Sequence, residues 1–514
     1  NFSTLAKSMQ IGQSRFPKTN KLQSDHSHPA ITVRLDACIH CNLCVRACRE
    51  IQVNDVIGLS GRGSNEQITF DFADHMGDST CVACGECVQV CPTNALQEAS
   101  VKSTITDETI RSICPYCGVG CQVNIHVKDN KISSVDGANG PSNEGRLCVK
   151  GRFGFDYIAS EQRLTEPLIR KKGVEKGLNI DPANPLSHFR KTSWDEALDH
   201  AAKGFLEHKK RYGGQSLAGF GSAKCSNEEA YLFQKLIRTG FGTNNVDHCT
   251  RLCHASSVAA LMETIGSGAV TAPFTAVKDS DVIIVIGSNP TENHPVAATF
   301  FKQAAQQGAE LIVMDPRAQA LKQHASHMLQ FSPGTDVALL NAIMHVIVTE
   351  KLYNKPYIQQ YTSGFEELSD HLKDFPPEMM QSICGVDAET IKTVARKYAK
   401  ANAPIIFWGM GIAQHTHGTD NARCLISLAL MCGHIGKPGT GLHPLRGQNN
   451  VQGASDAALI PMFFPNYKKT NDPESIAFFE SLWNTKLTHK DGLTVVEIMN
   501  AIHDDEIKSM YIMG

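Results

Sequence analysis

The chain of 514 residues is long enough for about three or four domains; 42% of it is hydrophobic, and 49 Lys and Arg nearly balance 52 Asp and Glu. This composition predicts a globular protein, and a net charge of −3 excludes a nucleic-acid binder that relies on overall charge. No run of hydrophobic residues is longer than five, whereas a transmembrane helix needs about 20, so we expect no direct membrane insertion.

The two ends of the sequence have unusual patterns. Residues 1–30 are polar, and we expect a linker or arm there. The sequence begins with Asn1, and no basic segment followed by an apolar one predicts a secretion signal. It ends on Lys508–Gly514, which has the pattern of a strand and its turn. Since a domain seldom ends on a buried strand, we expect the sequence to be a fragment of a longer protein.

Two cysteine runs with identical spacing, C-x2-C-x2-C-x3-C, lie between residues 31 and 104. The first consists of Cys38, Cys41, Cys44 and Cys48, and the second of Cys81, Cys84, Cys87 and Cys91. This is the bacterial ferredoxin spacing, in which the fourth Cys of each run binds the other cluster. We therefore predict one 4Fe–4S cluster on Cys38, Cys41, Cys44 and Cys91, and a second on Cys81, Cys84, Cys87 and Cys48.

Three other interpretations of these cysteines are weaker. Disulfides form mainly in secreted proteins, and nothing in the sequence indicates secretion. Zinc is usually held by paired C-x2-C arms from separate loops, which a triple run with a distal fourth Cys fits poorly. Inert core thiols would not repeat one spacing twice.

A third cysteine group lies between residues 108 and 165 and consists of Cys114, Cys117, Cys121 and Cys148. Its spacing, C-x2-C-x3-C followed by 26 residues before the last Cys, suits a third 4Fe–4S cluster, with zinc as the alternative. Between its arms, alternating stretches at 122–127 and 131–135 flank Asp129-Asn130, a pattern that predicts a β-hairpin.

Beyond residue 165 the pattern changes to alternating strands and helices. Candidate buried strands are Ser216–Phe220, Asp281–Ile286, Glu310–Met314 and Pro404–Trp408, and candidate helices include Glu228–Arg238, Val296–Gln307 and Asp336–Thr349. This alternation predicts an α/β fold with a doubly wound, mostly parallel sheet, placed behind N-terminal α+β iron–sulfur modules. Ligands of such sheets bind outside the carboxyl ends of the strands.

Three loops that follow these strands have residues suited to a nucleotide-type ligand: 287–295, 315–317 and 409–411. Small residues let a backbone approach phosphates, and free N–H groups at helix starts favour anions. Ordinary strand–helix turns use the same residues, so only the succession of three loops favours a nucleotide. Neither G-x-G-x-x-G nor G-x4-G-K-[ST] is present, which excludes an ordinary NAD- or ATP-binding chain.

Two further stretches carry reactive side chains. Cys253 and His254 precede a helical stretch at 257–263; a thiolate near a helix N-terminus suits a redox metal, and a His can move a proton near neutral pH. A buried structural Cys is the alternative. The stretch 444–454 combines Arg446 with two Asn and two Gln, which suits recognition of a carboxylate and of a large polar cofactor. A polar surface loop is the alternative.

These motifs together resemble the catalytic subunit of formate dehydrogenases that carry a molybdenum or tungsten bis-pterin guanine dinucleotide cofactor. The resemblance extends from about Arg34 to Gly514 and is most specific at Cys114–Cys148 with Val149-Lys150-Gly151, at Val246–Val258 and at Trp408–Gly453. It implies three 4Fe–4S clusters and a Mo- or W-bis(molybdopterin guanine dinucleotide). The two-cluster segment resembles that of the cytoplasmic, NAD-linked multisubunit members.

The resemblance also implies roles for individual residues. Cys253 would be the protein ligand of the metal, His254 the histidine beside the substrate, and Arg446 the arginine that holds the formate carboxylate. Gln448 lies close to that arginine, and Lys150 would bridge the third cluster and one pterin. The implied pterin dinucleotide contacts are Gly287, Asn289, His294, Asp315, Arg317, Gly409, Met410, Gly411, Gln448, Asn449, Asn450, Gln452 and Gly453.

The implied domains behind the arm are a two-cluster domain at 31–104, a third-cluster domain at 108–165, and two α/β pterin-binding domains. One of these combines 166–248 with 449–514, and the other, 249–448, carries the metal ligand. The resemblance implies oxidation of formate to CO2 in a cytoplasmic hetero-oligomer. Its electrons would pass to an FMN/NAD-binding diaphorase-type subunit or to another electron-acceptor subunit.

Two other functions compete with this one. A nitrate reductase of the same cofactor family also uses a cysteine ligand, but the Cys253-His254 pair and the 446–453 motif favour formate. An electron-transfer subunit of a respiratory complex would keep the fold and bind no pterin. The presence of Cys253, His254 and Arg446 together argues against that alternative.

Overall fold

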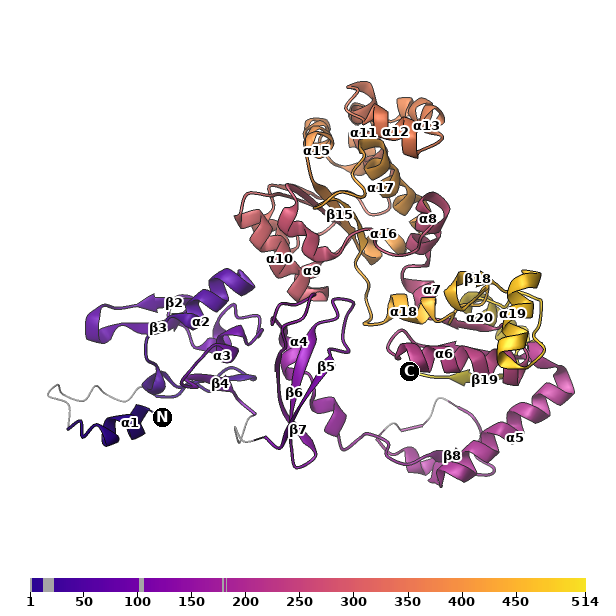
Figure 1. The fold of residues 1–514 in the computed structure, drawn as a ribbon, viewed down its shortest axis with the longest axis horizontal. Helices are drawn as coiled ribbons and strands as arrows, with labels where there is room; N and C mark the ends of the chain where they lie inside the picture. Colours follow the sequence, from indigo (N-terminus) through magenta and orange to yellow (C-terminus); the bar gives the residue numbers. More distant parts are fainter. Residues whose placement is uncertain (1, 13–22, 101–105, 178–179, 182) are drawn as a thin grey trace.

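The structure is a computed structural model that describes residues 2–12, 23–100, 106–177, 180–181 and 183–514. Two small N-terminal modules lie beside two α/β domains (Figure 1). Part of the expected arm is ordered on the first module. The helix α1 (Phe2–Ser8) begins the chain, and the side chains of Asp25 and Ser27 accept hydrogen bonds from the backbone N–H groups of Met76 and Gly77, each at 2.8 Å.

The first module holds the two repeated cysteine runs. Its ends pair as β1 (Ile31–Val33) and β4 (Leu96–Glu98), which are antiparallel and close the module. The remaining elements are α2 (Leu43–Arg46), η2 (Ala47–Gln52), the hairpin β2 (Ile57–Ser60) and β3 (Gln67–Phe70), and α3 (Glu86–Gln89). Each cysteine run therefore starts in a loop and ends in or just after a short helix.

The second module is a three-stranded antiparallel sheet formed by β5 (Glu108–Ile113), β6 (Gln122–Lys128) and β7 (Lys131–Gly137). The predicted hairpin is confirmed. Its two turn residues, Asp129 and Asn130, have φ values of 49° and 57°, as a type I′ turn requires, and Asn and Asp tolerate this conformation. The helix α4 (Val149–Phe153) begins directly after Cys148.

The larger α/β domain is built on a five-stranded parallel sheet with the order β14-β13-β12-β15-β16. Its strands are β12 (Val282–Ile286), β13 (Glu310–Met314), β14 (His327–Leu329), β15 (Pro404–Trp408) and β16 (Gly441–Pro444). The chain builds outward from β12 in one direction and then returns to its other side with β15. The order therefore reverses between β12 and β15, and such a reversal opens a crevice at the carboxyl ends of the strands.

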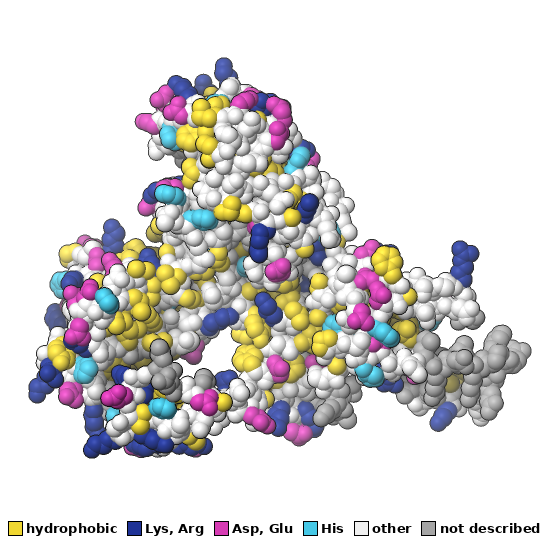
Figure 2. All heavy atoms as spheres, turned by 180° about the vertical axis from the view of Figure 1, so that it is seen from behind, with side chains coloured by type: hydrophobic (Ala, Val, Ile, Leu, Met, Phe, Trp, Pro, Cys, Tyr) yellow, Lys and Arg dark blue, Asp and Glu magenta, His cyan; other side chains and the backbone are white. Residues whose placement is uncertain are grey.

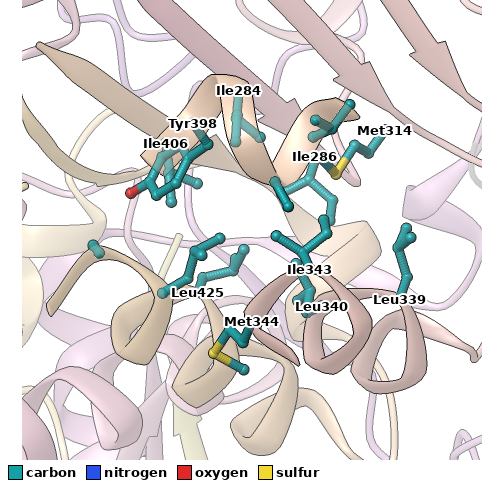
Figure 3. Close-up of a cluster of buried hydrophobic side chains, with 14 of the residues drawn as sticks. Ile284, Ile286, Met314, Leu339, Leu340, Ile343, Met344, Tyr398, Ile406 and Leu425 are labelled. Carbon is teal, nitrogen blue, oxygen red and sulfur yellow. The ribbon is translucent and has the colours of Figure 1, made fainter. Parts of the chain in front are cut away.

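Both faces of this sheet are buried, because successive side chains of a strand point to opposite faces. On one face, Ile284, Ile286 and Ile406 pack against α11 (Asp336–Thr349), α15 (Ala388–Lys400) and α17 (Gly418–Cys432) (Figure 3). On the other face, Ile283, Val285 and Phe407 belong to a cluster with Phe300 and Phe301 of α10 (Pro295–Gln306). That second cluster also includes Cys114, Cys121 and Leu147, so the third-cluster module packs on the α10 side.

The smaller α/β domain joins distant parts of the chain in one parallel sheet. Its strands are β10 (Leu217–Gly221), β11 (Val246–His248) and β19 (Ser509–Ile512), in the order β11-β10-β19. Its helices are α5 (Trp194–Tyr212), α6 (Asn227–Lys235), α18 (Val451–Asp456), α19 (Pro473–Trp483) and α20 (Val495–His503). The segments 166–248 and 449–514 thus share one sheet, and the C-terminus lies beside α6 (Figure 1).

The remaining elements are short connections or peripheral helices. They are β8 (Leu168–Arg170), β9 (Phe189–Lys191), α7 (Thr250–Cys253), α8 (Ala255–Ile265), α9 (Pro290–Asn293), α12 (Lys355–Tyr361), α13 (Phe365–His371), α14 (Pro377–Cys384), α16 (Met410–Ala413), β17 (Phe463–Phe464) and β18 (Lys468–Lys469). Side chains of both charge signs are intermingled over the face shown in Figure 2. Among the described helices, none has the length and apolar character needed to cross a bilayer.

We expect the Ile343→Ala substitution to destabilise the larger α/β domain. Ile343 is fully buried between α11 and the sheet, and removing such a side chain typically costs about 2–5 kcal/mol because a cavity remains. Ile383→Ala in α14 is the matched control, since Ile383 is 48% exposed and we expect a change within about 0.5 kcal/mol. Urea unfolding followed by Trp fluorescence measures both, and equal losses would contradict this packing.

Candidate active site and cysteine clusters

A cavity of about 700 Å³ lies at the carboxyl ends of the five parallel strands. Loops that follow all five strands line it, as the reversal between β12 and β15 predicts. Its volume falls within the range typical of ligand sites. The predicted contact residues that line it are Gly287, Asn289, His294, Asp315, Arg317, Gly409, Met410, Gly411 and Gln448, together with Lys150.

Glycines let the loops after β12 and β15 touch at this edge. The backbone N–H of Gly411 donates a hydrogen bond to the carbonyl of Gly287 at 2.9 Å. Gly287 has a φ of +57°, and a Cβ atom there would lie 2.8 Å from the carbonyl carbon of Gly411. Both the left-handed conformation and the close approach require glycine. The cavity is therefore bounded by backbone, which can approach a phosphate or pterin closely.

The cavity contains polar atoms that have no partner within the described part of the chain. The Nδ1 atom of His294 and the Oδ1 atom of Asp336 are buried without a hydrogen bond. Asp315 accepts hydrogen bonds from the backbone N–H of Arg317 at 2.9 Å and from the side chain of Gln319 at 3.3 Å, and burial raises its pKa. Because buried polar atoms are normally satisfied, this lining fits a large polar ligand.

Several lining residues were missed in the sequence. They are Tyr116, Phe331, Pro333, Gly334, Asp336 and His415, whereas the lining residues Ser288 and Asn293 lie within the predicted loop 287–295. The loop 331–336 follows β14, a strand of three residues that begins with His327 and has no clear apolar pattern. Once β14 is known, the Pro333-Gly334 turn behind it is a recognisable signal.

Four predicted cofactor contacts do not line this cavity: Asn449, Asn450, Gln452 and Gly453. Asn450 donates hydrogen bonds to the carbonyl of Cys225 at 2.8 Å and to the side chain of Asn227 at 2.9 Å. Gly453 also abuts Asn227. Here the start of α18 packs against the start of α6, while Gln452 lines a smaller cavity beside Arg446.

Cys253 is buried at the end of α7, beside the large cavity. Its Sγ atom lies 3.4 Å from Sδ of Met410 and 4.0 Å from Oε1 of Gln448. Burial raises the pKa of this thiol, while the N–H of Gly447 and the charge of Arg446 act in the opposite direction. The expected stabilisation of a thiolate near α8 is thus outweighed by burial. A bound metal ion would deprotonate such a thiol outright, so Cys253 can serve as a ligand.

Arg446 is buried with part of its guanidinium unpaired. Its Nη2 atom donates to the carbonyl of Gly268 at 2.9 Å and to Oε1 of Gln452 at 3.3 Å. Within the described residues, Nε and Nη1 have no acceptor. Arg446 also lines a second cavity of about 200 Å³, and His294 lines both this cavity and the large one. An unpaired, desolvated guanidinium is an anion site, because a carboxylate can supply the missing acceptors.

His254 does not line either cavity. It is fully buried, with Nε2 2.9 Å from the carbonyl of Leu445 and Nδ1 3.2 Å from the hydroxyl of Ser257. Burial lowers the pKa of His254 to about 3. In this arrangement the imidazole is neutral and positions the backbone next to Arg446, which differs from the proton-moving role expected from the sequence.

The twelve N-terminal cysteines form three groups. Cys38, Cys41, Cys44 and Cys91 surround one small cavity, and Cys114, Cys117, Cys121 and Cys148 surround another. Burial, followed by the charges of Cys84, Cys81, Cys48 and Cys44, raises the pKa of Cys87. Cys48 of the first run is thus near the second run, as the predicted exchange of the fourth ligand requires. Lys150 lines both the third-group cavity and the large cavity.

The geometry also bears on the alternatives for these cysteines. All 18 are free thiols, so the disulfide alternative is wrong in this structure. Among the described His, Cys, Asp and Glu side chains, no three converge closely enough to hold a single metal ion. A zinc site would draw its thiolates onto one ion, whereas each thiolate of a 4Fe–4S cube binds a different iron.

Comparison with known proteins identifies the class. Residues 163–514 match the molybdopterin oxidoreductase family, residues 107–160 match the molybdopterin oxidoreductase Fe4S4 domain, and residues 37–95 match the 4Fe-4S dicluster domain. The chain belongs to the molybdopterin oxidoreductase family. The predicted fold class is confirmed, as is the prediction of a molybdopterin cofactor with iron–sulfur clusters at the level of the family.

The curated relatives include several formate dehydrogenases. The F420-dependent formate dehydrogenase subunit alpha of Methanocaldococcus jannaschii is 41% identical over 79% of this chain and 57% of its own. A putative formate dehydrogenase of Staphylococcus haemolyticus is 33% identical over 97% of this chain and 53% of its own length. The probable oxidoreductase YjgC of Bacillus subtilis is 33% identical over 99% of this chain and 55% of its own length. The predicted resemblance to formate dehydrogenase catalytic subunits is confirmed. The chain spans about half the length of these relatives.

A solved structure shares the fold. Acetylene hydratase from Pelobacter acetylenicus superposes with a TM-score of 0.57 at 24% identity, over 64% of this chain and 44% of that one. This likeness concerns the fold alone, since proteins with one fold carry out many different reactions.

We expect Gly287→Ala to prevent loading of the molybdopterin cofactor, because its Cβ would displace the Gly411 loop. Gly308→Ala is the control for backbone strain. Its φ of +105° lies further from the left-handed region than the +57° of Gly287, so Ala is strained there at least as much, but no atom lies within 4 Å of the added Cβ. Metal analysis of the purified full-length protein should find Mo or W in the control and little in Gly287→Ala. Equal metal contents would contradict the role of this contact.

Proposed function

We propose that this chain contains the active site of a formate dehydrogenase, which oxidises formate to CO2 at a Mo- or W-bis(molybdopterin guanine dinucleotide) bound through Cys253. The observation that carries the proposal is the partly unpaired guanidinium of Arg446. Its Nε and Nη1 atoms are buried without an acceptor among the described residues, and its charge acts on the Cys253 thiol. Support comes from the names of the relatives in Methanocaldococcus jannaschii and Staphylococcus haemolyticus.

Arg446 would bind the substrate. Formate is a small anion, and charge-assisted hydrogen bonds from a desolvated guanidinium both neutralise and orient it. The contacts of Nη2 with Gly268 and Gln452 fix the plane of the guanidinium, which leaves its other N–H groups for the carboxylate. The His294 imidazole donates from Nε2 to the Arg446 carbonyl at 2.7 Å and thus holds the arginine backbone.

The residues around Arg446 would hold the active-site loop in position and would not react with the substrate themselves. His254 holds the Leu445 carbonyl, and Gln448 lies beside the Cys253 sulfur. When bound, the metal cofactor supplies the two-electron oxidation that breaks the formate C–H bond. Buried and neutral, His254 keeps the loop that carries Arg446 in register with Cys253.

Lys150 would connect the cofactor to the electron path. It lines the large cavity and also the cavity surrounded by the third cysteine group. From that group, electrons would reach the two ferredoxin-type groups and leave to a partner subunit. We propose three 4Fe–4S clusters in all, held by the twelve N-terminal cysteines.

Two electron acceptors are candidates. The two-cluster segment resembles that of cytoplasmic, NAD-linked members, so an FMN/NAD-binding diaphorase-type partner in a cytoplasmic hetero-oligomer is our proposal. The relative in Methanocaldococcus jannaschii is named F420-dependent, which makes coenzyme F420 the second candidate.

Metal analysis and activity assays on the full-length complex separate these possibilities. We expect about twelve Fe and one Mo or W per catalytic chain, with formate-dependent reduction of NAD+. Iron without Mo or W would favour an electron-transfer subunit, and nitrate reduction without formate oxidation would favour a nitrate reductase. Reduction of F420 in place of NAD+ would correct the partner and leave the formate reaction intact.

We expect Arg446→Ala to lower kcat/KM for formate by roughly 100-fold or more, because a preorganised charged donor is lost. The bound Mo or W should stay, since the Cys253 ligand is untouched. Arg423→Ala is the matched control in the same domain; Arg423 is half-exposed and pairs with Glu263 and Asp420. Formate oxidation with an artificial electron acceptor measures both variants. Unaltered turnover in Arg446→Ala would show that formate binds elsewhere.

A further inference from the structure

A buried lysine of the larger α/β domain reaches into the two-cluster module. Lys302 lies on α10 and is 4% exposed. Its Nζ atom donates hydrogen bonds to the backbone carbonyls of Gln52 at 2.6 Å and of Val53 at 3.1 Å. These carbonyls lie at the end of η2, the helix that carries Cys48.

Lys302 has no acidic partner within the described part of the chain. No Asp or Glu there lies within ion-pair distance of its Nζ atom, in contrast to the equally buried Arg152, which pairs with Glu86 at 2.9 Å. A buried ammonium without a counter-charge is unfavourable, so a negative group nearby would stabilise it.

The negative groups near Lys302 are cysteine ligands of the predicted inner cluster, defined as the cluster on Cys48, Cys81, Cys84 and Cys87. Burial lowers the pKa of Lys302 to about 8, while the charges of Cys84 and Cys48 act to raise it. The lysine is therefore mostly protonated at pH 7. In turn, burial and the charge of Asp55 raise the pKa of Cys48, while the charge of Lys302 acts in the opposite direction and favours its thiolate.

We propose that the Lys302 ammonium stabilises the reduced state of the inner cluster and so raises its reduction potential. Reduction adds one electron, and hence one negative charge, to a cluster held by four thiolates. A fixed positive charge nearby favours that state, and its effect is strong in a poorly solvated interior. The inference rests on the clusters of the proposed function but does not depend on formate as the substrate.

Other contacts place the inner cluster between the remaining two. Arg152, four residues beyond Cys148, donates from Nε to the carbonyl of Cys84 at 2.8 Å, and Glu86 accepts from the backbone N–H of Leu147 at 2.9 Å. Arg152 and Glu86 neutralise each other, and Asp55, whose charge also acts on Cys48, pairs with Arg49 at 2.8 Å. Lys302 is thus a buried cation at this cluster without an acidic partner among the described residues. Its charge would draw electrons from the third cluster toward the inner one.

A purely structural role for Lys302 makes a different prediction. The lysine could merely tie the module to α10 by capping η2. The neighbouring Gln303 provides the comparison, because its Nε2 atom donates to the carbonyl of Glu50 in the same helix at 2.5 Å. Gln303 makes the same kind of interdomain contact without a charge.

The test is an EPR-monitored redox titration of the full-length protein with dithionite, which requires neither formate nor the pterin cofactor. The EPR signal that disappears in the Cys84→Ser variant is assigned to the inner cluster. We expect Lys302→Gln to shift its midpoint potential to lower values, while Lys302→Arg and Gln303→Ala stay close to wild type. Iron content checks that each variant keeps its clusters.

An unshifted potential in Lys302→Gln would overturn the proposal, and so would equal shifts in Lys302→Gln and Gln303→Ala. If Lys302→Gln loses iron, the Gln303→Glu variant provides the test instead. It adds a negative charge at the same interface, and we expect it to lower the midpoint potential of the inner cluster. An unshifted midpoint potential in Gln303→Glu would refute the electrostatic role. A wild-type protein without a Cys84-dependent signal would overturn this inference together with the three-cluster proposal. Failure of formate oxidation alone would overturn only the proposed function.

Discussion

The rest of the structure depends on the reversal of strand order between β12 and β15. A parallel sheet with both faces buried leaves its carboxyl edge as the place where loops can open a site. The touching glycines Gly287 and Gly411 bring the two loops into contact at that edge. The large cavity, the Cys253 thiol and the Arg446 guanidinium are all arranged around this contact.

Buried polar contacts connect the cysteine modules to this sheet. Lys302 crosses from α10 to η2, and the Arg152–Glu86 pair joins the third-cluster module to the two-cluster module. These charged side chains find their partners only when the modules are in contact. Since an unpaired buried charge is costly, the contact is favoured. The same contacts therefore hold the modules together and set the electrostatic environment of the cysteines.

The polar groups of the site divide into satisfied and unsatisfied ones. His254 has both ring nitrogens occupied, whereas Arg446, His294 and Asp336 keep buried atoms without partners among the described residues. Satisfied groups give rigidity, and unsatisfied ones indicate where a ligand supplies the missing contact. This difference separates the residues that position the loop from those that would touch the substrate or cofactor.

Local patterns in the sequence determined the cysteine groups, the Asp129-Asn130 hairpin and the strands β13 and β15, because ligand spacing, turn chemistry and apolar runs act over a few residues. The short strands β14 and β16 lacked such a pattern, so the Pro333–Asp336 side of the cavity could not be predicted. Only the tertiary structure decided that His254 is enclosed, that Asn450 binds Asn227, and that Lys302 binds the end of η2, the helix that carries Cys48. These contacts join residues far apart in the chain, and burial and packing, which no local pattern records, decide which side chains meet.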